Sequence, residues 1–447
     1  MKKIWKKIVG GMLAMSLFLT ACGSNSSSNP ASSGTSTNGS LQSASQTTGK
    51  KVEIEYWHVN AETQGGVTVE ELVKKFNDSQ DEIHVTARYN PDMYKGLMQN
   101  LQAQQAAGKS PAIVQVGWAF LDYFSNNFAY LGPEEAIQKY DSENADYLSK
   151  TFLPNVLSLA KNSKDEQVGL PYSLSTPVLY INKDLLKEAG VDENGPKTWQ
   201  EVRDFAKTIK EKTGKYGLYV QEPADFWGQQ AILESNGGRM ITDGKASFNS
   251  PEGVEAMQLY ADMVNQDQSA LHISWDEGVQ SFIDGSTAML YTTIARRASI
   301  QKGAQFEVAA VVSPSFGYKT QALPAGGCFL AITATDEKEQ KAAWTFEKFL
   351  YENASLAAWT IGTGYVPPAI GVDTAEDGLK GFLEENKMMI PAITQMDKLV
   401  SWASFPGDAG LQAEQLLLDM RDAILGGEKD AATAMKETQN AINELLK

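Results

Sequence analysis

The 447-residue sequence lacks the local signatures of most enzyme classes. It contains no HExxH, no paired CxxC and no GxGxxG, which excludes the usual zinc-protease, cysteine-metal and dinucleotide-binding arrangements. Gly108-Lys109-Ser110 ends like a phosphate-binding loop, but Ala103 stands where the first glycine is required. We therefore expect a protein that is not an enzyme and that uses neither a cofactor nor a metal. A carboxylate pair for glycoside hydrolysis stays open, because its spacing is set by the tertiary fold.

Basic residues are also scarce. The chain has 39 Lys and Arg against 55 Asp and Glu, which gives a net charge of −16. This balance argues against nucleic acid as a partner, because neutralising phosphates needs clustered basic side chains. The length is sufficient for two lobes with separate cores. Most of the nine Trp and sixteen Tyr are expected in those cores, although a sugar-binding cleft uses the same flat faces with polar tips.

Apolar runs long enough to span a bilayer are missing as well. The most apolar stretch, Ile8 to Leu19, follows four lysines and precedes Leu19-Thr20-Ala21-Cys22. This order is typical of a signal peptide, which we place at residues 1–21. The last four residues resemble the bacterial lipobox, and that resemblance implies cleavage before Cys22 and a diacylglycerol on its sulfur. The alternative is a plain secretory signal with an incidental cysteine.

The segment after Cys22 has the composition of a linker. Residues 23–50 are almost all Ser, Asn, Thr, Gly, Gln and Ala, so we predict a flexible tether over residues 22–50. A lipid, a tether and a soluble domain together predict a protein anchored at the extracytoplasmic face of the bacterial cell membrane. With Cys22 acylated, the other cysteine, Cys328, has no disulfide partner, and we expect it to be a small buried residue.

The rest of the chain is organised around the segment Gly169 to Gly190. Its two prolines favour short extended pieces, and Val178 to Ile181 predicts a buried strand. Asn182 or Asp184 can then cap a following helix. An extended segment with Ser and Thr that leads into a buried strand can place hydroxyl and backbone N–H groups at a cleft wall. The alternative is an ordinary loop–strand–helix unit.

Within this segment, Pro171 to Asp184 (PYSLSTPVLYINKD) resembles the hinge segment of extracellular solute-binding proteins of ABC importers, the carbohydrate-type family 1. The form STPVLYxNKD is closest to the glycerol-3-phosphate-binding branch of that family. Further matches follow in the same order along the chain: Pro196–Trp199, Asn236–Gly238, Phe248–Gly253, Ala288–Met289, Ala325–Gly327 and Thr363–Pro367. The resemblance spans roughly residues 52 to 447.

The resemblance implies an α/β, two-lobed periplasmic-binding-protein fold with a hinge and an interlobe ligand cleft. The hydrophobic pattern agrees, because residues 51–116 read as strand–helix–strand–helix–strand, which predicts a parallel sheet. We place lobe I at residues 51–172 with 314–350, and lobe II at residues 173–313 with 351–447. The end of the chain is expected to form two helices that pack on lobe II.

Aromatic faces and polar side chains hold neutral sugars, so the candidate ligand-binding residues carry such groups. The residues that lie where the family has its site are Trp57, Tyr89, Trp118, Ser175, Trp227, Thr293, Gly326, Gly327 and Tyr365. Tyr89, Ser175 and Tyr365 resemble binding residues of the glycerol-3-phosphate branch. The paired glycines would let backbone N–H groups approach the ligand. For each lone aromatic residue, Trp57 above all, a place in the core is the alternative.

Two departures from the glycerol-3-phosphate branch bear on the ligand. Trp118 stands where that branch has an acidic ligand-binding residue, and the arginine that it uses late in the chain has no match in Phe405 to Leu411. A phosphate dianion without a guanidinium or ammonium partner would be held poorly. Arg296 or Arg297 could replace the missing group, unless both belong to a solvated helix start. Extra tryptophan and missing arginine together favour a neutral saccharide.

The resemblance thus implies a lipid-anchored, monomeric substrate-binding protein that captures a mono- or oligosaccharide and presents it to the permease subunits of an ABC transporter. Two alternatives remain. The first is a binding protein for glycerol-3-phosphate or a glycerophosphodiester, in which Arg296 or Arg297 is essential. The second is a secreted polysaccharide-acting enzyme, which would require an Asp or Glu and would turn over a saccharide.

Overall fold

The computed structural model describes residues 51–62, 65–91, 93–222, 225–405 and 410–447. By its internal contacts the chain divides into two units, Met1–Thr48 and Gly49–Lys447, and the second contains all of these residues. The predicted signal peptide, the lipid acceptor Cys22 and the predicted tether lie outside the described residues. Among the described helices, none combines the length and apolarity that a membrane crossing requires.

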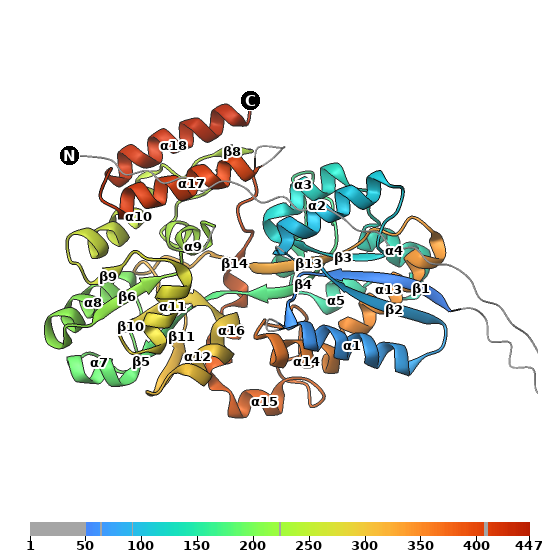
Figure 1. Ribbon diagram of the computed structural model, residues 1–447, viewed down its shortest axis with the longest axis horizontal. Coiled ribbons are helices and arrows are strands. Elements are labelled where there is room, and N and C mark those ends of the chain that lie inside the picture. The colour runs from blue at the N-terminus through green and yellow to red at the C-terminus, as the bar shows by residue number, and fades with distance from the viewer. Residues whose placement is uncertain (1–50, 63–64, 92, 223–224, 406–409) are drawn as a thin grey trace, which may run out of the picture. The chain divides into compact units, whose positions relative to one another are not determined.

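A five-stranded sheet forms the centre of the first lobe (Figure 1). Its strands, in spatial order, are β2 (Ile83–Tyr89), β1 (Val52–His58), β3 (Ile113–Gly117), β13 (Gly326–Ile332) and β4 (Leu170–Ser175). β1 runs parallel to β2 and to β3, as the sequence pattern predicted, whereas β13 runs antiparallel to β3 and β4. A strand from late in the chain therefore lies between two early ones.

Helices cover this sheet with periodic apolar side chains. α1 (Gly66–Ser79) buries Val69, Leu72, Val73 and Phe76. Phe76 packs edge-on against Phe346 of α13 (Glu337–Leu350), with 4.9 Å between the ring centroids. α2 (Met93–Ala106) follows β2 and leads to β3. In each helix the apolar residues are spaced so that they fall on one face, which explains why its position was predictable.

A second five-stranded sheet forms the centre of the second lobe. Its strands, in order, are β11 (Val308–Val311), β5 (Pro177–Asn182), β10 (Thr287–Thr293), β6 (Tyr216–Val220) and β9 (Ala270–Leu271). α8 (Trp199–Thr213) begins with a capping box between Thr198 and Glu201. The terminal helices α17 (Gly410–Leu425) and α18 (Ala431–Leu445) lie beside α10 (Pro251–Asn265), as predicted for the end of the chain (Figure 1).

The chain crosses from the first sheet to the second at Thr176. β4 ends at Ser175 and β5 begins at Pro177, so the predicted hinge segment consists of two buried strands joined by one residue. The side chain of Asn182 then accepts a hydrogen bond from the Leu185 N–H and caps α7 (Lys183–Ala189), which selects one of the two caps expected.

Two more connections join the sheets. Residues 312–325 lead from β11 to β13, and the chain between α14 (Asn353–Thr363) and α17 leads back to the second lobe. They pair with each other through β12 (Leu323–Pro324) and β14 (Leu399–Val400). The buried amide of Gln395 ties the connections together. It donates to Thr176 Oγ1 and to the Pro177 carbonyl oxygen, and it accepts from the Ser313 N–H.

The lobe boundaries differ from those expected. β4 continues the first sheet to Ser175, beyond the expected boundary at residue 172. α14 was expected in lobe II, but it packs on α1 of the first lobe (Figure 1). Its Trp359 ring stacks on Tyr172 of β4, with 4.9 Å between centroids. The physical reason is that α14 is apolar on several sides, so its sequence did not indicate which lobe covers it.

Candidate ligand-binding cleft

The facing edges of the two sheets meet at Thr176. In the first sheet, the strand register sets Ser175 opposite Gly326 and Gly117 opposite Cys328. In the second sheet, Thr293 stands opposite Pro177. Most of the candidate residues follow or end strands of the two sheets. These strand ends therefore lie on either side of Thr176, where the chain passes from one sheet to the other. In open α/β sheets, ligands bind outside such strand ends.

Ser175, Gly326 and Trp227 pack together beside this crossing, and we call this buried group the centre. A Cβ atom at Gly326 would lie 2.3 Å from the Ser175 hydroxyl oxygen and 3.4 Å from the Trp227 ring. Trp227 opens α9 (Trp227–Ser235) of the second lobe, so the centre joins side chains of both lobes. Its indole is 2% exposed, and its Nε1 has no hydrogen-bond partner among the described residues.

Two half-buried carboxyl groups hold the start of α9 in place. The Phe226 N–H donates to Glu414 at 2.8 Å, and the Trp227 N–H donates to Asp225 at 3.1 Å. Burial raises the pKa of Glu414 to about 7 and the pKa of Asp225 to about 6. Phe226 and Trp227 are both buried. They pack inward because α9 is covered all round rather than on one face.

Tyr365 approaches the cleft from the first lobe. Its ring is parallel to that of Trp359, with 6.1 Å between centroids, and burial raises its pKa to about 12. The preceding Gly364 lies against the second lobe, since a Cβ there would be 3.1 Å from the Ala295 backbone. Gly327 has a φ of +107°, and a side chain there would collide with the Ser173 carbonyl oxygen. Only glycine suits that position.

Thr293 and Arg296 occupy the second-lobe side. The Thr293 hydroxyl accepts from the Ala295 N–H at 3.2 Å and so caps a short turn. The half-buried Arg296 guanidinium lies 4.0 Å from the centroid of Trp275, at the start of α11 (Trp275–Ile283), and forms no ion pair with any described carboxylate. Burial lowers its pKa. Arg297 instead donates to Gln301 and packs within α12 (Arg297–Gly303).

Trp57 and Tyr89 lie away from this centre. The Trp57 indole N–H donates to Glu55 at 2.8 Å, and the Arg88 guanidinium lies 4.7 Å from its ring centroid. That environment matches the core alternative for Trp57. Tyr89 is 48% exposed, with its ring 6.0 Å from that of His58. His58 is a buried strand-end residue that was not among the candidates, and burial lowers its pKa to about 4, which keeps the imidazole neutral.

A hollow of about 370 Å³ adjoins the centre. Trp118 of the first lobe lines it together with Gln230 of α9 and Trp402. The Trp402 ring lies 6.4 Å from that of Trp227. Sequence reasoning missed Trp402, because its segment shows no helical or strand periodicity. The only available signal was its place just before Phe405, in the stretch where the related branch carries a ligand-binding arginine.

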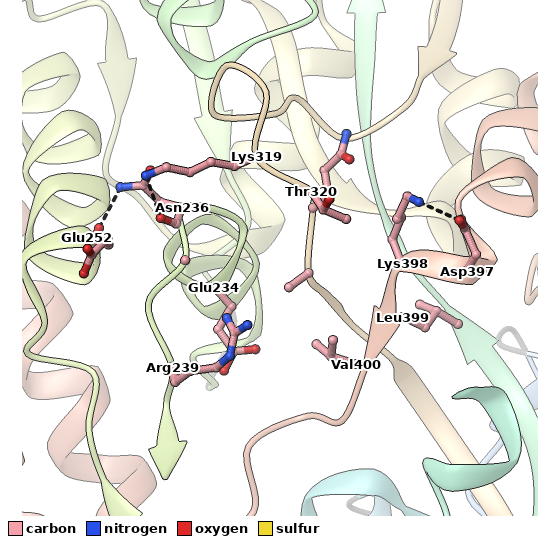
Figure 2. Close-up of a pocket in the computed structure, with 13 residues that line it drawn as sticks. Glu234, Asn236, Arg239, Glu252, Lys319, Thr320, Asp397, Lys398, Leu399 and Val400 are labelled. Atoms are coloured by element: carbon pink, nitrogen blue, oxygen red, sulfur yellow. Dashed lines mark hydrogen bonds and ion pairs between the residues drawn. The ribbon is translucent and has the colours of Figure 1, made fainter. Parts of the chain in front are cut away.

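A second hollow of about 650 Å³ lies beside the inter-sheet connections (Figure 2). Several of its charged groups already have partners within the protein. Lys319 Nζ donates to the carbonyl and side-chain oxygens of Asn236, at 2.9 and 2.6 Å, and Lys398 pairs with Asp397 at 2.5 Å (Figure 2). The Glu234 carboxylate accepts from the Met240 N–H. The polar groups that line this hollow therefore stabilise the connections between the two sheets.

One cluster of possible metal ligands lies in the second lobe. Glu222, His272 and Asp422 offer atoms within 4.8 Å of one another. However, Glu222 already accepts from the Tyr260 hydroxyl at 2.5 Å and lies 2.6 Å from His272 Nδ1, while Asp422 pairs with Arg421 at 2.9 Å. The hydrogen bond to Glu222 raises the pKa of His272. The group is explained as an internal hydrogen-bond network.

Comparison with known proteins gives consistent matches over most of the chain. The family model described as "Bacterial extracellular solute-binding protein" matches residues 71–381. The sn-glycerol-3-phosphate-binding periplasmic protein UgpB of Yersinia pestis is 29% identical over 364 residues, which cover 77% of this chain and 80% of that protein. UgpB of Escherichia coli K12 is 26% identical over 418 residues, which cover 88% of this chain and 92% of that protein.

Solved structures share the fold at lower identity. The cyclic alpha-maltosyl-1,6-maltose binding protein from Arthrobacter globiformis matches with a TM-score of 0.76 and 21% identity, over 89% of this chain and 99% of that chain. UgpB from Mycobacterium tuberculosis, solved with glycerophosphocholine, matches with a TM-score of 0.75 and 20% identity over the same shares. These likenesses confirm the predicted two-lobed α/β fold.

Proposed function

Because this chain belongs to the bacterial extracellular solute-binding protein family, as its sequence motifs predicted, we propose that it captures a neutral mono- or oligosaccharide for an ABC importer. The observation that carries the ligand class is the pair of buried indoles in the cleft. Trp118 and Trp227 are 3% and 2% exposed, and the Nε1 of each has no partner among the described residues. The Nε1 atoms of Trp199, Trp275 and Trp359 also have no partner among the described residues, so the support comes from the flat faces of Trp118 and Trp227 near the crossing, which suit a sugar ring.

The arrangement suits a protein that closes on its ligand. Ser175 and Gly326 come from the first lobe and Trp227 from the second, so a ligand at the centre touches both lobes at once. A ligand that binds the closed form more tightly shifts the population toward it. The closed form would then present the sugar to the permease subunits. No bond is made or broken in this cycle.

The anchoring part of the proposal rests on the sequence before residue 51. Residues 1–21 would be the signal peptide, Cys22 the lipid acceptor, and residues 22–50 the tether. A lipid and a flexible tether would keep the binding domain close to its transporter at the extracytoplasmic face and raise its effective concentration there.

Glycerol-3-phosphate or a glycerophosphodiester is the second candidate ligand. Two observations favour it: relatives at up to 29% identity are named as glycerol-3-phosphate-binding proteins, and Arg296 carries no ion pair among the described residues. A guanidinium is the usual partner of a phosphate. We rank this candidate second, because the resemblance to that branch predicts an acidic ligand-binding residue at position 118. This chain has a tryptophan there.

A thermal-shift screen of the purified protein separates the two ligands. The panel would hold neutral mono- and oligosaccharides, glycerol-3-phosphate and glycerophosphocholine. A ligand at a hundredfold its Kd adds about 2.7 kcal/mol to the free energy of unfolding and moves the midpoint by a few degrees. A shift with a neutral sugar, without product after long incubation, supports the proposal. A shift only with the phosphate esters overturns it in favour of the second candidate.

A further inference from the structure

We propose that two contacts between the lobes act as a latch and a stop, which set how often and how far the lobes close before any ligand is bound. The latch is the hydrogen bond from the Ser404 hydroxyl to the Ala119 carbonyl oxygen. The stop is Gly364 against the Ala295 backbone. Groups of the chain alone make both contacts, so they can form without a ligand. This inference does not depend on which ligand binds.

The latch donor, Ser404, is fixed to the second lobe on both sides. The side-chain amide of Gln230 on α9 donates to the Ser401 carbonyl oxygen and accepts from the Ala403 N–H, each at 3.0 Å. The residue after Ser404, Phe405, is 5% exposed and belongs to the core of the second lobe. Ser404 therefore moves with the second lobe when the lobes rotate.

The latch acceptor belongs to the first lobe. Ala119 lies in the short helix η2 (Trp118–Phe120), directly after β3 of the first sheet. The Trp118 ring packs on Phe329 of β13, with 5.7 Å between centroids, and this contact holds η2 to the first sheet. The 3.0 Å hydrogen bond thus joins the two lobes. It is lost once rotation lengthens it by more than about 0.5 Å.

The stop lies where α14 ends. Gly364 directly follows α14, whose Trp359 stacks on Tyr172, so it belongs to the first lobe. Ala295 lies in the short helix η4 (Ile294–Arg296), directly after β10 of the second sheet. A Cβ atom at Gly364 would lie 3.1 Å from both the Cα atom and the carbonyl oxygen of Ala295, which is closer than ordinary contact. The missing side chain therefore lets the lobes approach each other here.

The latch should favour the closed form by a limited amount. One neutral hydrogen bond changes the ratio of closed to open protein about two- to tenfold. A ligand that requires the closed form has an apparent affinity proportional to the closed fraction, so the latch also tunes affinity. The stop limits the closed form itself, because a side chain at residue 364 would hold the lobes apart.

The test is double electron–electron resonance on the purified protein without ligand. Spin labels at Glu71→Cys on α1 and at Lys436→Cys on α18, both exposed positions, report the distance between the lobes. Cys22→Ala removes one native thiol, and the other, Cys328, is buried. We expect two distance populations in this labelled protein, a short one for the closed form and a long one for the open form.

Ser404→Ala should lower the ratio of the short to the long population about two- to tenfold, whereas Ser404→Thr keeps the hydroxyl and should preserve the ratio. Gly364→Ala should lengthen the short distance. Gly371→Ala is its matched control, because Gly371 has a φ of +82° against +83° at Gly364, but an added Cβ meets no atom of the described residues within 4 Å.

Three results would overturn the proposal. A single open population, unaltered by the variants, would show that the lobes do not close without a ligand. An unchanged ratio in Ser404→Ala would show that the hydrogen bond persists while the lobes move, and equal effects of Gly364→Ala and Gly371→Ala would assign the stop to backbone strain. These distances are measured without ligand, so failure of every saccharide to bind would overturn the proposed function and leave the latch and the stop intact.

Discussion

Gly326 faces Ser175 across two antiparallel strands so closely that a methyl group on Gly326 would lie 2.3 Å from the Ser175 hydroxyl oxygen. The same methyl group would lie 3.4 Å from the Trp227 ring of the other lobe. The missing side chain thus leaves room for the hydroxyl of Ser175, while the Trp227 ring of the second lobe lies at ordinary contact distance. The centre of the cleft depends on that closeness.

Gly326→Ala should therefore weaken ligand binding by about tenfold or more in Kd, because the added methyl group forces the Ser175 hydroxyl to move. Overpacking of this kind also costs about 1–3 kcal/mol of stability. Calorimetry gives the affinity and thermal unfolding the stability. Gly381→Ala is the matched control, since a Cβ there meets open space in an exposed helix. Unchanged binding in Gly326→Ala would show that the ligand lies elsewhere.

Arg296→Ala should separate the two candidate ligands. For a neutral sugar we expect less than a threefold change in Kd, because the guanidinium is stacked on Trp275 rather than placed in the sugar centre. For glycerol-3-phosphate, loss of a charge-assisted contact should cost about tenfold or more. Arg88→Ala, which removes a guanidinium stacked on Trp57, is the control. A large loss of sugar affinity in Arg296→Ala would move Arg296 into the sugar site.

Glu347→Gln should make stability less dependent on pH. Glu347 of α13 is 2% exposed, its Oε1 has no partner among the described residues, and burial raises its pKa to about 8. The folded protein therefore holds this proton more tightly than the unfolded chain, so the free energy of unfolding falls as pH rises from about 4.5 to about 8. At about 1.4 kcal/mol per pH unit, the effect reaches a few kcal/mol.

We expect the glutamine variant to unfold at a higher temperature than the unmodified protein near pH 9, and at the same temperature near pH 4.5, where the unfolded chain also begins to hold the proton. Differential scanning calorimetry across this range measures both. Glu385→Gln, an exposed change on α15 (Lys380–Glu385), should give no such difference. If Glu347→Gln raised the unfolding temperature equally at both pH values, the stabilisation would not come from the protonation of Glu347.

Cys22→Ala should release the protein from the membrane. If Cys22 carries a diacylglycerol, the unmodified protein fractionates with membranes and the variant appears in the soluble fraction, because the lipid supplies the anchoring energy. Cell fractionation with immunoblotting, together with labelling by a lipid probe, measures this. Cys328→Ala keeps Cys22 and should not alter the distribution. A soluble unmodified protein would support the plain secretory signal.

Much of the fold was predictable because it rests on local periodicity. The alternation in Val52–His58 and the one-sided helix Gly66–Ser79 indicate a parallel α/β unit on their own. The insertion of β13 between β3 and β4 was not predictable from local pattern, since strand order is set by contacts far apart in the chain. The placement of α14 failed for a related reason, because its burial on several sides gives no preferred face.

Residue type and strand ends together led to the candidate residues, and their role in ligand binding stays a prediction. Ser175, Gly326, Trp227 and Tyr365 lie at the facing edges of the sheets or beside them. Trp57 could not be separated from its neighbours in sequence, because strand alternation decides which face it takes, and here it turns toward Glu55 and Arg88. Trp402 has no local pattern at all, so only the fold brings it beside Trp227.

The single amide of Gln395 has a mechanical consequence for the way the lobes move. It bonds to Thr176, Pro177 and Ser313, which belong to two of the three connections, from a position in the third. Strands tied together in this way turn as one bundle, so the lobes should rotate about a common axis rather than slide or twist independently. A protease cut in any one connection would leave the fragments joined, and the nicked protein should still open and close.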